Sequence, residues 1–127
     1  MTAENAMLPL QPDFVREFAQ QWVQAWNRHE IDQILAHYDD DVILISPVAL
    51  KLMGGDGSVR GKPALKDYFL SGLNAYPNLR FDLLDTLCGL ETIVLCYMNA
   101  VRGNKTAEVM RMNASGKVQQ VWANYDR

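Results

Sequence analysis

Apolar residues recur at helical spacing in the first third of the chain. Between residues 14 and 26 they fall at every third or fourth position, which predicts a helix with one buried face: Phe14, Phe18, Trp22, Ala25 and Trp26. Asp13 is a suitable N-cap for this helix. Residues 1–12, which contain Pro9 and Pro12, are expected to form an arm that leads to it.

Two further helices are predicted from the same periodicity. The first covers residues 30–38 and turns four residues to the core: Ile31, Ile34, Leu35 and Tyr38. The second opens at Gly61, with Pro63 suited to its first turn. Its apolar face comprises Leu65, Tyr68, Phe69, Gly72 and Leu73. Between these helices, residues 47–60 hold three of the eight glycines and are expected to form a mobile loop.

The second half of the chain has the pattern of strands separated by short turns. Strands are predicted over residues 79–88, 93–102, 105–113 and 117–125, after a shorter one over residues 42–46. Helices followed by a meander of strands indicate a single α+β domain over residues 13–127, with a curved, mainly antiparallel sheet.

A lone acid, Glu108, lies among apolar residues in the predicted hairpin that turns at Gly103-Asn104. Side chains alternate across a sheet, so Tyr97 and Asn99 share one face of the first strand, and Glu108 and Met110 share a face of the second. A two-residue Gly-Asn turn would place Asn99 opposite Glu108. A carboxyl beside an amide and a phenol, with Leu and Met around them, indicates a small-molecule pocket.

Composition and charge narrow the function classes. The chain has 49% hydrophobic residues, a net charge of −3 and twelve scattered Lys and Arg residues, which argues against a nucleic-acid partner. Residues 1–12 have no basic leader and no apolar stretch suggests a membrane span, so a cytoplasmic protein is expected. Cys88 and Cys96 are predicted to be buried, reduced thiols, with a disulfide as the alternative.

Neither a metal nor a cofactor is predicted. His29 and His37 lie near residues 39–41, which are all Asp, but no third ligand follows at a fixed spacing. The glycine-rich stretch 54–62 fails the phosphate-loop pattern, because Asp56 stands where the first glycine belongs and Pro63 where Ser or Thr should be. It is interpreted as a lid or a plain loop.

Several short motifs, in order along residues 14–125, carry a family resemblance. They are Trp26-Asn27 before Ile31-Asp32, Tyr38-Asp39-Asp40-Asp41-Val42, Ser46-Pro47, Gly61-Lys62-Pro63-Ala64-Leu65 and Asn113-Ala114-Ser115-Gly116-Lys117-Val118. With these motifs the chain resembles the nuclear transport factor 2-like superfamily, in particular its polyketide-cyclase-like and ketosteroid-isomerase-like members. The resemblance implies a cone-shaped fold in which a strongly curved mixed sheet wraps around three helices and encloses a pocket. It also implies a homodimer formed through the outer face of the sheet, where Trp122 is expected.

The steroid-isomerase branch uses an aspartate base, a tyrosine and a protonated acid. Carried over by position, the base falls on Ser46, the tyrosine on Trp22 and the acid on Glu108. Since two of the three roles are lost, ketosteroid isomerisation by that mechanism is not expected. Limonene-epoxide-hydrolase chemistry needs an arginine in the pocket, whereas Arg111 falls on the opposite face from Glu108. Polyketide cyclases pair an acid with a histidine, and the predicted strands contain no histidine.

Two interpretations remain open. In the first, the chain binds a compact apolar or aromatic ligand with a carbonyl or hydroxyl group, and Glu108 serves as a cofactor-free proton donor or acceptor of isomerase, cyclase or dehydratase type. In the second, it is a non-catalytic ligand-sensing or protein-interaction dimer. The predicted ligand contacts are Trp22, Tyr38, Ser46, Phe69, Tyr97, Asn99, Met110 and Tyr125.

Overall fold

The computed structural model describes residues 10–126, so most of the predicted arm lies outside the described residues. The helices are α1 (Pro12–Asn27), α2 (Ile31–Leu35), α3 (Pro47–Met53) and α4 (Lys62–Ala75). The strands are β1 (Tyr38–Ile45), β2 (Ser58–Arg60), β3 (Phe81–Cys88), β4 (Thr92–Asn99), β5 (Asn104–Met112) and β6 (Val118–Tyr125).

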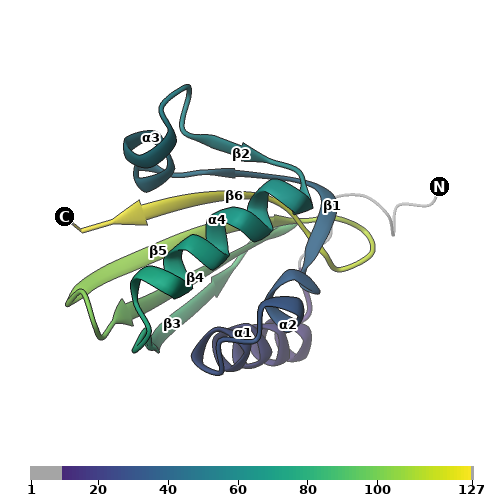
Figure 1. The fold of residues 1–127 in the computed structure, drawn as a ribbon. Helices are drawn as coiled ribbons and strands as arrows, with labels where there is room; N and C mark the ends of the chain where they lie inside the picture. Colours follow the sequence, from purple (N-terminus) through teal and green to yellow (C-terminus); the bar gives the residue numbers. More distant parts are fainter. Residues whose placement is uncertain (1–9, 127) are drawn as a thin grey trace.

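The six strands form one mixed sheet in the order β2-β1-β6-β5-β4-β3. Only β1 and β6 run parallel, and the other neighbours are antiparallel. The sheet curves around α4, and α1 and α2 lie together beside it (Figure 1). The predicted α+β class and the cone-shaped arrangement are therefore confirmed.

Aromatic side chains join α1 to the sheet and to α4. The α1 residues Val15, Phe18, Ala19, Trp22, Ala25 and Trp26 are buried. Trp22 stacks on Phe81 of β3 with ring centroids 5.9 Å apart, and Trp26 meets Phe69 of α4 edge-to-face at 4.8 Å. Such pairs add about 0.5–1.5 kcal/mol each beyond the burial of their area. Two details of the prediction for α1 are wrong: the helix begins at Pro12 with Gln11 as N-cap, and Phe14 is 37% exposed.

The predicted helix over residues 30–38 is wrong in its second half, because α2 ends at Leu35 and Tyr38 begins β1. The reason is pairing with a distant strand. The backbone N–H of Val118 donates to the carbonyl of His37 at 2.8 Å, and Tyr38 pairs with Val118 in the parallel ladder. A hydrogen bond from the Trp22 indole to the Tyr38 hydroxyl, 3.0 Å long, then fixes the side chain. None of these partners lies in the local sequence.

The expected loop over residues 47–60 is also wrong, since it contains α3 and β2. Ser46 caps α3 by accepting a hydrogen bond from the Val48 N–H at 3.1 Å, and Pro47 occupies the first turn. The chain then reverses through Gly57 (φ 79°) so that β2 can pair with β1. A Cβ at Gly57 would lie 3.2 Å from the Ser46 carbonyl oxygen, so glycine is required by space as well as by φ.

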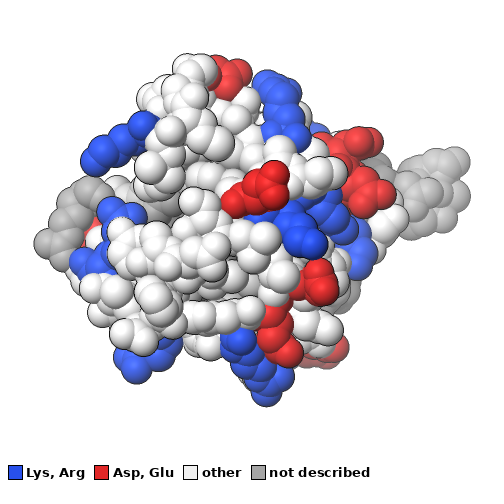
Figure 2. Space-filling view, viewed as in Figure 1, with Lys and Arg blue, Asp and Glu red and all other residues white. Residues whose placement is uncertain are grey.

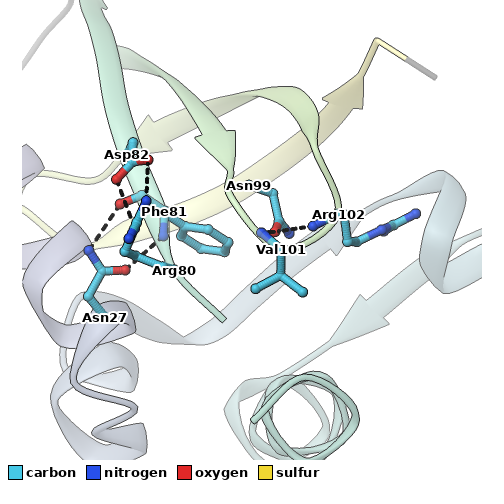
Figure 3. A network of polar contacts seen from close by, with 7 residues as sticks. All are labelled: Asn27, Arg80, Phe81, Asp82, Asn99, Val101 and Arg102. Atoms are coloured by element: carbon cyan, nitrogen blue, oxygen red, sulfur yellow. Dashed lines mark hydrogen bonds and ion pairs between the residues drawn. The ribbon is translucent and has the colours of Figure 1, made fainter. Parts of the chain in front are cut away.

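The turn between β4 and β5 differs from the prediction. Asn99 pairs with Asn104, so the connection is the four residues 100–103 rather than a two-residue Gly103-Asn104 turn. The Asn99 side-chain oxygen accepts hydrogen bonds from the backbone N–H groups of Val101 and Arg102, both at 3.1 Å (Figure 3). This Asx-type turn is more favourable here than the tighter one.

The register consequently differs from the prediction, and Glu108 lies opposite Leu95 rather than Asn99. The residue opposite Asn99 is Asn104 instead of Glu108, which is an even shift of four positions along β5. Each side chain therefore keeps its predicted face, because faces alternate with a period of two. Tyr97 and Glu108 remain on the concave side of the sheet.

The two cysteines do not match the predicted burial. Cys88 is exposed and Cys96 is half-buried, and neither forms a disulfide. Within residues 10–126, no helix is long and apolar enough to cross a membrane.

Candidate functional site

A cavity of about 370 Å³ lies between α3, the C-terminal half of α4 and the concave face of the sheet. Its wall is mainly apolar, with Leu44, Val48, Leu52, Phe69, Leu79 and Phe81 among its members. The surface between α3 and the C-terminal part of α4 is mostly uncharged, with Lys and Arg side chains along its left edge, and many charged side chains of both signs gather around the other end of α4 (Figure 2). The cavity is thus a mostly apolar space at one end of the cone.

Glu108 and Tyr97 form a buried pair in the wall of this cavity. Glu108 is 8% exposed and Tyr97 is 4% exposed. The Tyr97 hydroxyl donates to Oε2 of Glu108 at 2.5 Å, across neighbouring strands. Among the side chains of residues 10–126, Tyr97 is the one that hydrogen-bonds this carboxyl. The second carboxyl oxygen, Oε1, accepts no hydrogen bond from the described residues.

The surroundings of Glu108 shift its protonation. Burial disfavours the charged form and raises the pKa of Glu108 from its ordinary value of 4.5 to about 7, while the Tyr97 hydrogen bond acts in the opposite direction with a smaller effect. Burial, and then the negative charge of Glu108, raise the pKa of Tyr97 well above 10.0, so Tyr97 remains a donor. A carboxyl that titrates near neutral pH can both give and take a proton.

A second group of polar side chains lies on the β1–α3 side of the cavity. The Ser46 hydroxyl is 3.4 Å from the Tyr125 hydroxyl. Burial raises the pKa of Tyr125 to about 12 and also raises the pKa of Tyr68, while hydrogen bonding to Ser46 lowers both to a smaller extent. These neutral hydroxyls can orient a ligand oxygen, but Ser46 cannot act as a carboxylate base.

The structure brings six of the nine predicted site residues to the cavity wall: Ser46, Phe69, Tyr97, Asn99, Glu108 and Tyr125. It does not bring Trp22, Tyr38 or Met110 there, because all three are at most 1% exposed and pack behind the wall in the core. Asn99 reaches the cavity, but its side-chain oxygen holds the β4–β5 turn. The predicted contact between Asn99 and Glu108 is therefore absent from the described structure.

The sequence prediction did not assign several polar residues of the wall to the site, among them Lys51, Tyr68 and Arg102. Helical periodicity predicts Tyr68 on the apolar face of its helix, and that periodicity is the signal that could have assigned it to the cavity wall. Lys51 and Arg102 lie in segments predicted as a loop and a strand end, where no periodicity indicates which way a side chain points. The pair His29 and His37 has structural contacts: a ring nitrogen of His29 is 2.9 Å from the Leu79 carbonyl, and His37 packs on Phe18. Residues 10–126 contain no group of three or more His, Cys, Asp or Glu residues that could hold a metal ion.

Comparison with known proteins assigns this chain to a family. The model of the SnoaL-like domain matches residues 19–123. The chain belongs to the SnoaL-like family. The predicted resemblance to the nuclear transport factor 2-like superfamily is confirmed with it, since other matched structures are described as NTF2-like proteins. A search of curated proteins returned no match.

Solved structures support the fold of this SnoaL-like chain. A SnoaL-like protein of unknown function from Burkholderia thailandensis is 31% identical with a TM-score of 0.90, covering 94% of this chain and 100% of the other. A proposed isomerase of the SnoaL-like family from Agrobacterium tumefaciens is 15% identical (TM-score 0.70, 91% and 99% covered). AclR, a proposed hydroxylase from Streptomyces galilaeus, is 18% identical (TM-score 0.70, 91% and 80% covered). The last two likenesses concern the fold alone.

Proposed function

We propose that this SnoaL-like protein binds a compact apolar or aromatic ligand with a carbonyl or hydroxyl group, and that Glu108 exchanges a proton with it. The observation that carries the proposal is the Glu108 carboxyl, buried in an apolar cavity wall with one oxygen bonded by Tyr97 and a pKa near 7. The cavity volume of about 370 Å³ is close to the lower end of the ~300–1,000 Å³ range of ligand pockets, which favours a compact ligand.

The chemistry that suits this site is proton transfer next to a carbonyl. Ionised Glu108 takes a proton from the carbon beside the carbonyl, and the resulting enolate oxygen is stabilised by the neutral hydroxyls of Tyr68, Ser46 and Tyr125. Protonated Glu108 then returns the proton to the same or another carbon, which gives exchange or isomerisation. The same acid could assist a cyclisation or a dehydration. In each of these reactions one carboxyl can both take up and return the proton, so no cofactor is needed. Isomerase chemistry is also the activity proposed for the Agrobacterium tumefaciens relative.

The test combines ligand binding with proton exchange. A panel of compact aromatic ketones and phenols, including 2-tetralone, is screened by thermal shift. The loss of α-protons from each ketone that binds is then followed by NMR in D₂O with the wild type, Glu108→Gln and Tyr97→Phe. We expect exchange that accelerates as pH rises through about 7, and a loss of about 100-fold or more in Glu108→Gln. Tyr97→Phe keeps the carboxyl and should retain exchange. A panel without any stabilising compound, or equal exchange in wild type and Glu108→Gln, would overturn the catalytic proposal.

A second candidate function is a non-catalytic ligand sensor or interaction dimer, and Ser46 favours it. This residue stands where the steroid-isomerase branch has its base, and its hydroxyl caps α3 instead. Binding of the panel without any Glu108-dependent exchange would support this candidate.

The proposed partner, in both cases, is a second copy of the chain. Trp122 of β6 is 37% exposed and pairs with Val109, while its neighbours Val121 and Ala123 are buried on the other face. An apolar, outward-facing tryptophan beside Val109 is suited to an isologous contact between two sheets.

A further inference from the structure

The acidic and basic residues of the cavity wall differ in how deeply they are buried. Of its lining residues, three have acidic or basic side chains: Glu108, Lys51 and Arg102. Glu108 is buried, whereas Lys51 and Arg102 are exposed.

Lys51 and Arg102 come from different segments that meet at one end of the cone. Lys51 is in α3 and Arg102 is in the β4–β5 turn, and both segments lie at the same end of the sheet as the C-terminal end of α4 (Figure 1). The Arg102 side chain extends away from the Asn99 carboxamide that holds its backbone (Figure 3). Its charge also reaches the cavity hydroxyls, because it lowers the pKa of Tyr68 and of Tyr125 slightly against the larger, opposing effects of burial.

Neither cation has an acidic partner in the described part of the chain. The ion pairs there join Arg16 to Asp13, Arg60 to Asp56, Lys62 to Asp40 and Arg80 to Asp82. Lys51 and Arg102 are thus two cationic groups in the cavity wall that form no ion pair with another residue of the range 10–126. Other exposed basic residues of the described chain, such as Lys66, also form no ion pair, but they do not line this cavity.

The backbones that carry these cations are held by residues of the cavity itself. Ser46 caps the helix of Lys51, and Asn99 accepts the two N–H groups of the turn that holds Arg102. Two residues predicted as direct ligand contacts therefore also position the segments at the entrance. Pre-organised segments reduce the ordering that binding requires.

We propose that the ligand of this cavity carries an anionic group, a carboxylate, at the end opposite its carbonyl or hydroxyl, and that Lys51 and Arg102 bind it at the entrance. The inference rests on the proposed function, because it assumes that the same ligand exchanges its proton with Glu108. The ligand class is accordingly a compact aromatic or alicyclic oxo- or hydroxy-carboxylate. The anionic end remains near water, where its desolvation is least costly.

The test compares two probes that differ in charge alone, 6-hydroxy-2-naphthoate and 6-hydroxy-2-naphthamide. Binding to the ligand-free protein is measured by naphthol fluorescence and by calorimetry at pH 7. We expect the carboxylate to bind the wild type about tenfold more tightly than the amide, since two exposed charge pairs together are worth between about twofold and thirtyfold. The preference should shrink in high salt because the groups are exposed.

Two double variants identify the source of the preference. Lys51→Gln with Arg102→Gln should remove it by weakening the binding of the carboxylate to the level of the amide. The matched control, Lys66→Gln with Lys105→Gln, removes two exposed cations that do not line this cavity and should keep the preference. Equal binding of both probes to the wild type, or a preference that persists in the first double variant, overturns this inference and leaves the proposed function standing. If neither probe binds and the ketone and phenol panel also fails, both are overturned.

Discussion

Replacing Glu108 with glutamine should change how the stability of the protein depends on pH. In the folded state burial raises the pKa of Glu108 from 4.5 to about 7, so the folded protein holds this proton more tightly than the unfolded chain does. Below pH 4.5 both states are protonated and no cost arises. As the pH rises through 7, the folded state must hold a buried carboxylate, and stability is lost.

The size of the effect follows from that pKa. A rise from 4.5 to about 7 corresponds to about 3 kcal/mol of unfolding free energy at alkaline pH, most of which is lost between pH 5 and pH 8. Glutamine has nearly the same shape, stays neutral at every pH and can still accept the hydrogen bond from Tyr97. The variant should therefore be similar to the wild type near pH 5 and more stable by about 2–3 kcal/mol at pH 8.

The assay is urea denaturation of both proteins from pH 5 to pH 9. The difference between the two curves cancels the titration of all other groups. Glu17→Gln on α1 is the control, because that acid is exposed and its removal should give a difference near zero at every pH. Parallel stability curves for wild type and Glu108→Gln would refute the reasoning, since they would mean that Glu108 is ionised at little cost in the folded state.

Three further predictions concern the Tyr97–Glu108 pair, the proposed dimer and the stability of the fold. Tyr97→Phe removes the hydrogen bond that lowers the pKa of Glu108, so this pKa should rise above about 7 in a carbon-13 NMR titration of the carboxyl, and an unchanged value would contradict the pairing. Trp122→Glu should give a monomer in size-exclusion chromatography with light scattering if the outer sheet face forms a dimer; an unchanged dimer would place the interface elsewhere. Asn27→Ala should lower the unfolding free energy by about 1–3 kcal/mol, because the Asn27 side chain accepts from the Phe81 N–H at 2.8 Å and donates to the Phe81 carbonyl at 3.0 Å (Figure 3). A urea-derived loss below about 0.5 kcal/mol would show that water replaces these bonds.

The entrance of the cavity illustrates how a mistaken local prediction can conceal a residue of the cavity wall. A two-residue turn at Gly103-Asn104 would have left Arg102 at the end of a strand. The longer turn held by Asn99 places Arg102 in the wall of the cavity instead. Similarly, Lys51 became part of the wall because residues 47–53 form a helix rather than a loop.

The sequence by itself determined the fold class and the faces of its elements. The helical spacing from Phe18 to Trp26 identified the buried stripe of α1, and alternation along β4 and β5 placed Tyr97 and Glu108 on the same face even though the register was wrong. Both signals are local, because they depend on the fixed repeat of a helix or a strand.

The tertiary structure decided where elements end, which polar residues meet and how Glu108 titrates. Tyr38 joins a strand because Val118 pairs with it from the far end of the chain. Trp22 and Met110 lie behind the cavity wall because α1 and the sheet close over them, while Tyr68 and Tyr125 meet beside Ser46. The pKa of Glu108 depends on desolvation by side chains from several elements together. Strand pairing and desolvation both depend on residues far apart in the sequence, so no local pattern predicts them.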